Sequence, residues 1–120
     1  NVLCIFDDID GIQDKKVKKA IYSMRDTFLR MGRHANISLI ITNHALAGGQ
    51  ETKTIIQECP YVVVFPKSTS IQNLETLLST YHGFKMSDIK ELIALNTRWA
   101  MSCRNYPQYI LWQSGAYMLR

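Results

Sequence analysis

Short apolar runs, each followed by a change to other residue types, predict three strands within the first 65 residues of the chain. They occupy residues 2–6, 37–41 and 61–65. The first run shows no alternation of apolar and polar positions, which is typical of a strand buried on both faces of a sheet. Cys4 lies inside this run and is expected to be buried as a small hydrophobic residue.

Apolar residues at helical spacing predict a helix between the first two runs. Positions 17, 20, 21, 24, 28 and 31 are apolar and fall on one face of a helix that we place at residues 15–31. Asp14 offers the side chain for its N-cap. Gly32 is expected at the C′ position, where a left-handed backbone conformation favours glycine.

The rest of the chain predicts three more helices and a hairpin. The helices are residues 50–58, 71–81 with Ser70 as cap, and 88–96 with Ser87 as cap. Residues 108–113 and 116–119 flank Ser-Gly and predict a β-hairpin. Alternating strands and helices of this kind predict an α/β fold: a mainly parallel sheet with flanking helices, closed by a C-terminal β-hairpin.

Polar residues follow each of the three predicted strands. They are Asp7-Asp8, Thr42-Asn43-His44 and Pro66-Lys67. In open α/β sheets, ligands bind at the carboxyl ends of the strands. If the three strands are adjacent and parallel, these residues converge on one crevice.

Apolar residues followed by two acids form the Walker B pattern of nucleoside triphosphatases. The strand would hold the Asp7 carboxylate where it binds Mg²⁺ through the water shell of the ion. Asp8 could then polarise the attacking water, although glutamate is usual at that position. Asn43, at the next strand end, fits a polar residue that senses the γ-phosphate, and the alternative is a simple Thr-Asn turn.

Arg33 lies in a Gly-Arg-His turn that precedes the second strand, at the opposite edge of the sheet from Asp7. It therefore cannot easily reach a phosphate bound by its own subunit. In a ring it could act on the neighbouring subunit's phosphate as an arginine finger. The structural alternative is neutralisation of the helix C-terminus.

The net charge of +4 is unevenly distributed along the chain. Residues 11–34 carry seven basic and two acidic side chains, a balance of +5. Four lysines occupy the first turns of the predicted helix: Lys15, Lys16, Lys18 and Lys19. Cations oppose the helix dipole at that end, which favours a role in binding the phosphates of nucleic acid over a role in stabilising the helix. The alternative is a solvated helix face.

The composition favours an ordered protein of a reducing compartment. Of the 120 residues 47% are apolar, and no apolar run approaches the ~20 residues of a membrane-spanning helix. Three cysteines without a C-x-x-C pair do not form a disulfide framework or a zinc ribbon. The chain begins with Asn1 and a strand-like run, so we expect it to be part of a longer protein.

Three segments together resemble a known family. Residues 2–8 (VLCIFDD), 31–34 (MGRH) and 36–43 (NISLIITN) resemble the DNA packaging ATPases of large double-stranded DNA viruses, which are P-loop motors of the FtsK/HerA group. The resemblance covers residues 1–66 well, and beyond them only the general plan agrees. His44 departs from the glutamine-like residue often found nearby in these proteins.

This resemblance implies an FtsK/HerA/RecA-like fold and a function. The intact protein would be an ATPase that uses ATP and Mg²⁺ to translocate or package double-stranded DNA. Asp7 would be the Mg²⁺-side acid, Asp8 the catalytic acid, Asn43 the sensor and Arg33 the arginine acting in trans. The implied partners are double-stranded DNA, further copies in a homo-oligomeric ring, and capsid or portal-type components, in the host cytoplasm or the virion.

No G-x-x-x-x-G-K-[ST] sequence occurs in the chain. Without this P-loop there is no backbone cradle for the phosphates and no lysine on the β- and γ-oxygens. Residues 1–120 are therefore expected to be the C-terminal half of an ATPase core, from Walker B onward, and to be inactive alone.

Two other classes remain open. A receiver-like signalling domain without catalysis would explain the length, the acidic pair and Lys67, but the second strand lacks the phosphoacceptor aspartate. A metal-dependent nuclease built on Asp7 and Asp8 would require further carboxylates at other strand ends.

Overall fold

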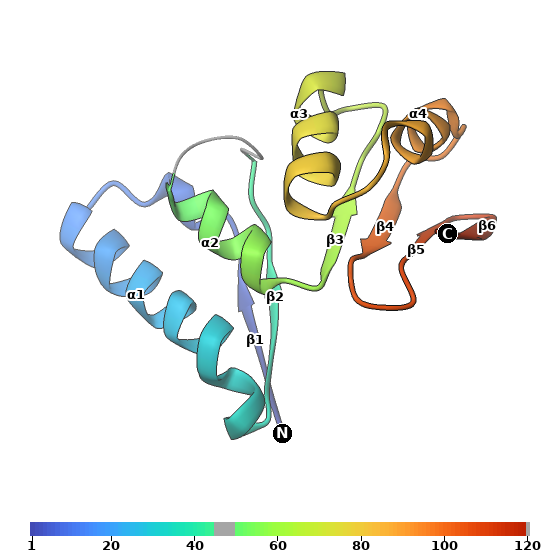
Figure 1. Ribbon diagram of the computed structural model, residues 1–120. Helices are drawn as coiled ribbons and strands as arrows, with labels where there is room; N and C mark the ends of the chain where they lie inside the picture. Colours follow the sequence, from blue (N-terminus) through green and yellow to red (C-terminus); the bar gives the residue numbers. More distant parts are fainter. Residues whose placement is uncertain (45–49, 120) are drawn as a thin grey trace. The chain divides into compact units, whose positions relative to one another are not determined.

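The computed structural model describes residues 1–44 and 50–119, with the side chains of Gln50 and Glu51 left out. The chain divides into two compact units, Asn1–Glu58 and Cys59–Arg120. Each unit contains its own sheet. Figure 1 shows the elements of both units in chain order. Among the described residues, no helix combines the length and the apolar character needed to cross a membrane.

The first unit is built on two parallel strands. Its elements are β1 (Val2–Phe6), α1 (Lys15–Met31), β2 (Ile37–Ile41) and α2 (Gln50–Glu58), with short 3-10 turns at Ile9–Gly11 and Gly32–Ala35. β1 pairs with β2 from Val2 opposite Ile37 to Phe6 opposite Ile41. Phe28 of α1 contacts the ring of Phe6, with 6.3 Å between ring centroids. The parallel pair and its crossover helix are as predicted.

The N-terminus of α1 is capped as predicted, but its C-terminus is not. Asp14 caps the N-terminus as predicted, because its Oδ1 accepts from the backbone N–H groups of Lys16 and Val17 at 2.8 and 3.1 Å. The expected left-handed Gly32 is wrong, since its φ is −57° and the chain continues as a 3-10 turn. Asn36 adopts the left-handed conformation instead, with φ 54°. Gly32 lies close to the following strand, and a Cβ there would be in tight contact with the carbonyl oxygen of Ile37 at 3.2 Å.

The apolar face predicted for α1 is only partly covered in the described structure. Ile21 and Phe28 of this face are half-buried, and the Phe28 ring contacts Phe6. Val17, Met24 and Met31 are 47%, 46% and 62% exposed. The fully buried residues of the helix, Tyr22 and Arg25, lie outside the predicted stripe.

The prediction that β1 is buried on both faces is also wrong for the described residues. Val2, Leu3 and Ile5 are each more than half exposed. Cys4, expected to be buried, is half-buried. A strand is buried on both faces only where other elements cover both faces, and of β1 only Phe6, which the Phe28 ring of α1 contacts, is buried.

The second unit combines four antiparallel strands with helices. Its elements are β3 (Tyr61–Val64), α3 (Ile71–Glu75) continued by a π-helical turn (Thr76–Tyr81), α4 (Met86–Ala94), β4 (Ala100–Cys103), β5 (Tyr109–Trp112) and β6 (Gly115–Met118). The strand order is β3-β4-β5-β6. Most of the best-buried apolar residues lie here: Val64, Leu74, Leu77, Leu78, Ile89, Leu92, Ala100 and Ile110.

The prediction of a single, mainly parallel sheet is corrected to a mixed α/β arrangement. β3 does not extend the β1–β2 sheet but pairs antiparallel with β4, which the sequence pattern did not predict. The residues of β4, Ala-Met-Ser-Cys, include no β-branched or aromatic side chain, so the usual strand signal is absent. α4 also begins at Met86 with Lys85 as its cap, and not after Ser87.

The C-terminal hairpin and the cap of α3 are confirmed. Ser70 Oγ accepts from the N–H of Asn73 at 3.2 Å. β5 and β6 pair with Trp112 opposite Gly115. Gly115 lies against the Trp112 ring, because a Cβ there would meet Cζ2 of the ring at 2.8 Å.

A buried histidine connects the helical segment of the second unit to its sheet. His82 is 3% exposed, and its Nδ1 lies 3.1 Å from Ser102 Oγ in β4. Its backbone carbonyl accepts from Gln108 Nε2 at 3.1 Å, and its ring meets Phe84 edge-on. Burial lowers the pKa of His82 from 6.5 to about 4, and the charge of Arg104 acts in the same direction.

This histidine should make the protein less stable at mildly acidic pH. The unfolded chain takes up a proton at His82 below pH 6.5, whereas the folded chain does not until about pH 4. The free energy of unfolding should therefore fall by about 2 kcal/mol between pH 7 and pH 5. Urea denaturation at the two pH values measures this. The fall should shrink in His82→Gln and persist in His34→Gln, which changes an exposed histidine; an equal fall in both variants would contradict it.

Candidate functional site

The parallel register brings the ends of β1 and β2 side by side. The N–H of Thr42 donates to the carbonyl oxygen of Phe6 at 3.0 Å, so the pairing extends one step beyond β2. The residues that follow the two strands therefore leave the sheet together. We call Asp7, Asp8, Thr42, Asn43 and His44 the strand-end cluster.

Thr42 holds the acidic pair from the neighbouring strand end. Its Oγ1 donates to Asp7 Oδ1 at 2.5 Å and accepts from the backbone N–H of Asp8 at 3.1 Å. One hydroxyl thus fixes the orientation of the Asp7 carboxylate and the backbone that leads to Asp8. Thr42 was not predicted to have a role of its own, although a hydroxyl residue opposite an acid at paired strand ends is a signal that could have indicated one.

Asp8 is presented outward by an unusual backbone conformation. Its φ of 48° and ψ of 39° are left-handed, which aspartate tolerates better than most residues. Asp8 Oδ1 lies 3.2 Å from His44 Nε2, and the side chains are 58% and 83% exposed. Water therefore reaches the Asp8 carboxylate freely, and the contact with His44 is a weak surface pair.

Asn43 contributes an amide oxygen that lacks a partner. The Oδ1 atom of Asn43 is buried, and among the residues that the structure describes it accepts no hydrogen bond. A buried acceptor left unsatisfied is costly, and such atoms often mark places where a water or ligand binds. Asn43 directly follows Thr42, so this acceptor belongs to the same strand end as the acidic pair.

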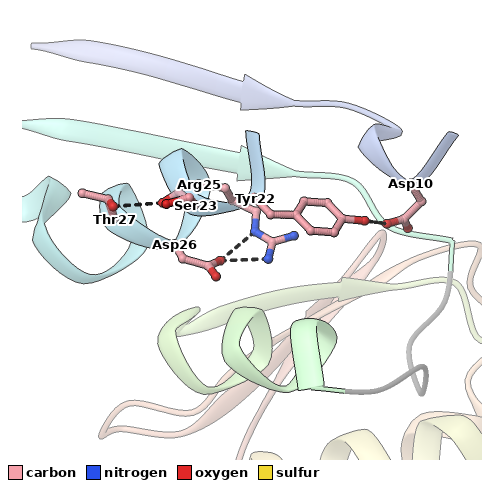
Figure 2. A network of polar contacts seen from close by, with 6 residues as sticks. All are labelled: Asp10, Tyr22, Ser23, Arg25, Asp26 and Thr27. Carbon is pink, nitrogen blue, oxygen red and sulfur yellow. Dashed lines mark hydrogen bonds and ion pairs between the residues drawn. The ribbon is translucent and has the colours of Figure 1, made fainter. Parts of the chain in front are cut away.

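Asp10 does not share the environment of Asp7 and Asp8. It lies in the 3-10 turn Ile9–Gly11, and its Oδ1 accepts from the hydroxyl of Tyr22 at 2.6 Å. Figure 2 shows this bond, which links the turn after β1 to the middle of α1. Lys18 Nζ also donates to the backbone carbonyl of Asp10 at 2.8 Å. Asp10 is therefore a turn and anchoring residue.

The other predicted site residues do not join the strand-end cluster. Arg33 lies in the turn before β2, while Asp7 follows β1, so the two residues flank opposite ends of the parallel pair. Lys67 follows β3, which belongs to the antiparallel sheet of the second unit. Of the three strand ends expected to meet at one sheet edge, the β1–β2 sheet therefore brings together two, those of β1 and β2. A receiver domain would need Lys67 on the same sheet as the acidic pair, and Lys67 follows a strand of the other sheet.

The basic residues of α1 separate into two sets. Lys15, Lys18 and Lys19 line a surface groove of about 870 Å³, together with Arg30 near the end of the helix. Lys16 is exposed but does not line this groove.

The donor set of the strand-end cluster fits a lightly coordinated magnesium ion. Mg²⁺ prefers oxygen ligands, keeps several waters and often binds one or two carboxylates with substrate phosphates. Asp7 provides an oriented carboxylate and Thr42 a neighbouring hydroxyl. Within the described residues no three His, Cys, Asp or Glu side chains gather as a metal site, so the carboxylate cluster that a nuclease would use is not observed.

The fold and site define a mixed α/β protein with a polar cluster at the ends of two parallel strands. The chain is homologous to a protein of viral origin, the uncharacterized protein V3 of Sputnik virophage. The two are 34% identical over 118 residues, which is 97% of this chain and 48% of V3. The chain thus spans about half the length of this relative. No protein-family model and no solved structure match it.

Proposed function

We propose that the chain is the Walker B half of an ATP-driven motor that translocates or packages double-stranded DNA. The observation that supports this most directly is the hydrogen bond from Thr42 Oγ1 to Asp7 Oδ1, because it joins two strand ends at the place where such motors bind nucleotide. The homology to a virophage protein about twice as long is consistent with a viral motor whose P-loop lies elsewhere in the polypeptide.

The roles of the residues follow from their positions. Asp7 and Thr42 would hold magnesium, which when bound supplies positive charge against the phosphates. The exposed carboxylate of Asp8 accepts a proton from the attacking water as that water attacks the γ-phosphate. The unpartnered Oδ1 of Asn43 accepts a hydrogen bond from the same water and so orients it.

Arg33 acts on a different active site from that of its own subunit. It is exposed and lies at the opposite end of the parallel pair from Asp7. In a homo-oligomeric ring it would stabilise transition-state charge on the neighbour's phosphate, so that loss of the γ-phosphate changes the contact between subunits. DNA and capsid or portal-type components are the macromolecular partners of this proposal, in the reducing host cytoplasm or the virion.

The test uses the longer protein with its P-loop. We expect ATP turnover that rises when linear double-stranded DNA is added, and no turnover from the 120-residue chain alone. An Arg33→Ala subunit mixed with wild type should lower turnover more steeply than its mole fraction, because each defective arginine disables a neighbour. His34→Ala, in the same exposed turn, is the control and should dilute activity in proportion. A linear decline with Arg33→Ala would contradict the trans role, and absence of DNA-stimulated turnover would contradict the motor.

A further inference from the structure

One face of α1 forms a long basic groove. The residues that line it fall at helical spacing on a single side of the helix: Lys15, Lys18, Lys19, Tyr22, Ser23, Asp26, Thr27, Arg30 and Met31. From Lys15 to Arg30 this face extends about 22 Å at 1.5 Å per residue. All of the lining side chains come from one helix, so the groove is a trough along the surface and does not enclose a ligand.

The positive charge of the groove is not cancelled by its own acid. Asp26 is the acidic residue of the lining, and its Oδ1 accepts from Nε and Nη2 of Arg25 at 2.9 and 2.8 Å. Arg25 itself is buried, and Figure 2 shows its two contacts with Asp26. The Asp26 charge is thus paired with a residue beneath the surface and does not neutralise the lining cations, of which Lys15, Lys19 and Arg30 are exposed.

The lining also has little means of reading a base. Tyr22 is buried, its hydroxyl is bonded to Asp10, and the Arg25 guanidinium covers its ring at 4.5 Å from the centroid. Apart from Met31, the remaining neutral groups are the hydroxyls of Ser23 and Thr27. The Ser23 hydroxyl can donate to a phosphate oxygen, whereas the Thr27 hydroxyl already donates to the Ser23 carbonyl at 2.9 Å. This is the chemistry of sequence-independent contact with a phosphodiester backbone.

We infer that this groove binds the phosphate backbone of double-stranded DNA through Lys15, Lys19 and Arg30, with Lys18 held at its edge by Asp10. A duplex presents one negative charge per about 1.7 Å of its axis, so a straight 22 Å trough faces several phosphates at once. The inference rests on the proposed function for its choice of nucleic acid. It deepens that proposal by assigning the contact to one face of α1 and by excluding Lys16.

The experiment compares the DNA affinity of two triple variants of equal charge. Affinity is measured by fluorescence anisotropy with a 30-base-pair duplex of random sequence. The measurements cover a series of KCl concentrations and contain no nucleotide. The groove variant is Lys15→Gln, Lys19→Gln and Arg30→Gln. The control variant is Lys16→Gln, Lys53→Gln and Lys67→Gln, which removes the same charge from exposed positions outside the groove. Circular dichroism and urea denaturation verify that both variants fold.

We expect the groove variant to lose at least about tenfold in affinity at 100 mM KCl and to reduce the slope of log K against log salt by about two to three. The DNA affinity of the control variant should stay within about threefold of that of the wild type. Equal losses in both variants, or no loss in either, would overturn the inference. Stronger competition by single-stranded DNA or by RNA of the same length would overturn the choice of duplex.

The outcome is separable from that of the motor proposal, because the binding assay contains no ATP. If the longer protein hydrolyses no ATP but the groove variant, unlike the control variant, loses affinity for DNA, the motor proposal is wrong and the inference that the groove binds DNA is supported. If turnover is observed but the groove variant binds DNA as wild type does, the groove is wrong and the motor stands.

Discussion

In the proposed motor, an Asp8→Asn variant should bind ATP with near wild-type affinity and hydrolyse it at least about 100-fold more slowly. Asparagine keeps the size of the side chain but cannot accept a proton from water, and a positioned general base contributes about 10²- to 10⁴-fold. The backbone of Asp8 is held by Thr42 through its N–H, so the substitution leaves that hydrogen bond in place. Single-turnover phosphate release and binding of a fluorescent ATP analogue measure the two quantities separately.

Asp7→Asn is the informative comparison for this experiment. It should weaken Mg²⁺-dependent nucleotide binding as well as turnover, because the Asp7 carboxylate, and not that of Asp8, is the one oriented by Thr42 Oγ1. Asp10→Asn should affect neither quantity strongly, since Asp10 is bonded to Tyr22 and lies outside the strand-end cluster. Undiminished turnover in Asp8→Asn would remove Asp8 from the mechanism.

The strand-end cluster shows which parts of a site a sequence can predict. A parallel pair with a crossover helix is encoded locally, by two apolar runs and a helix of the right length with a capping aspartate, and the structure has all three. The proximity of Asp7 to Thr42 follows from that pairing alone. The contact between Asp8 and His44 does not, because it depends on the left-handed backbone at Asp8, which no pattern of hydrophobicity signals.

The sheet of the second unit shows where local patterns fail. The sequence of β3 predicts a buried parallel strand, but β3 pairs antiparallel with β4, a short Ala-Met-Ser-Cys strand almost 40 positions later in the chain. Ser102 in β4 is fully buried and bonded to His82, so tertiary packing and not propensity keeps this segment extended. The same reasoning explains α1, whose buried residues are Tyr22 and Arg25 because polar pairing allows them to leave water.

Replacing Arg25 with alanine should destabilise the chain by about 3 kcal/mol and lower its melting temperature by roughly 10 °C. Three contributions add up to this loss. The guanidinium stacks over the Tyr22 ring, worth about 1–2 kcal/mol. Its hydrogen bonds to Asp26 are charged, worth about 1.5–3 kcal/mol. Truncation of a side chain that is 2% exposed also leaves a cavity. Thermal and urea denaturation measure the loss.

Two further variants separate charge from packing at this position. Arg25→Met keeps most of the side-chain volume, so it should recover part of the stability that Arg25→Ala loses. The control is Arg30→Ala, on the exposed face of the same helix, which should lower the free energy of unfolding by less than about 0.5 kcal/mol. Arg25→Met also leaves Asp26 without its partner at the groove, and it should therefore weaken DNA binding although Arg25 itself is buried. Adding Asp26→Asn to Arg25→Met should restore that binding. If binding instead remains at the wild-type level in Arg25→Met, the pairing of Asp26 does not control the charge of the groove, and its four cations attract phosphate without that help.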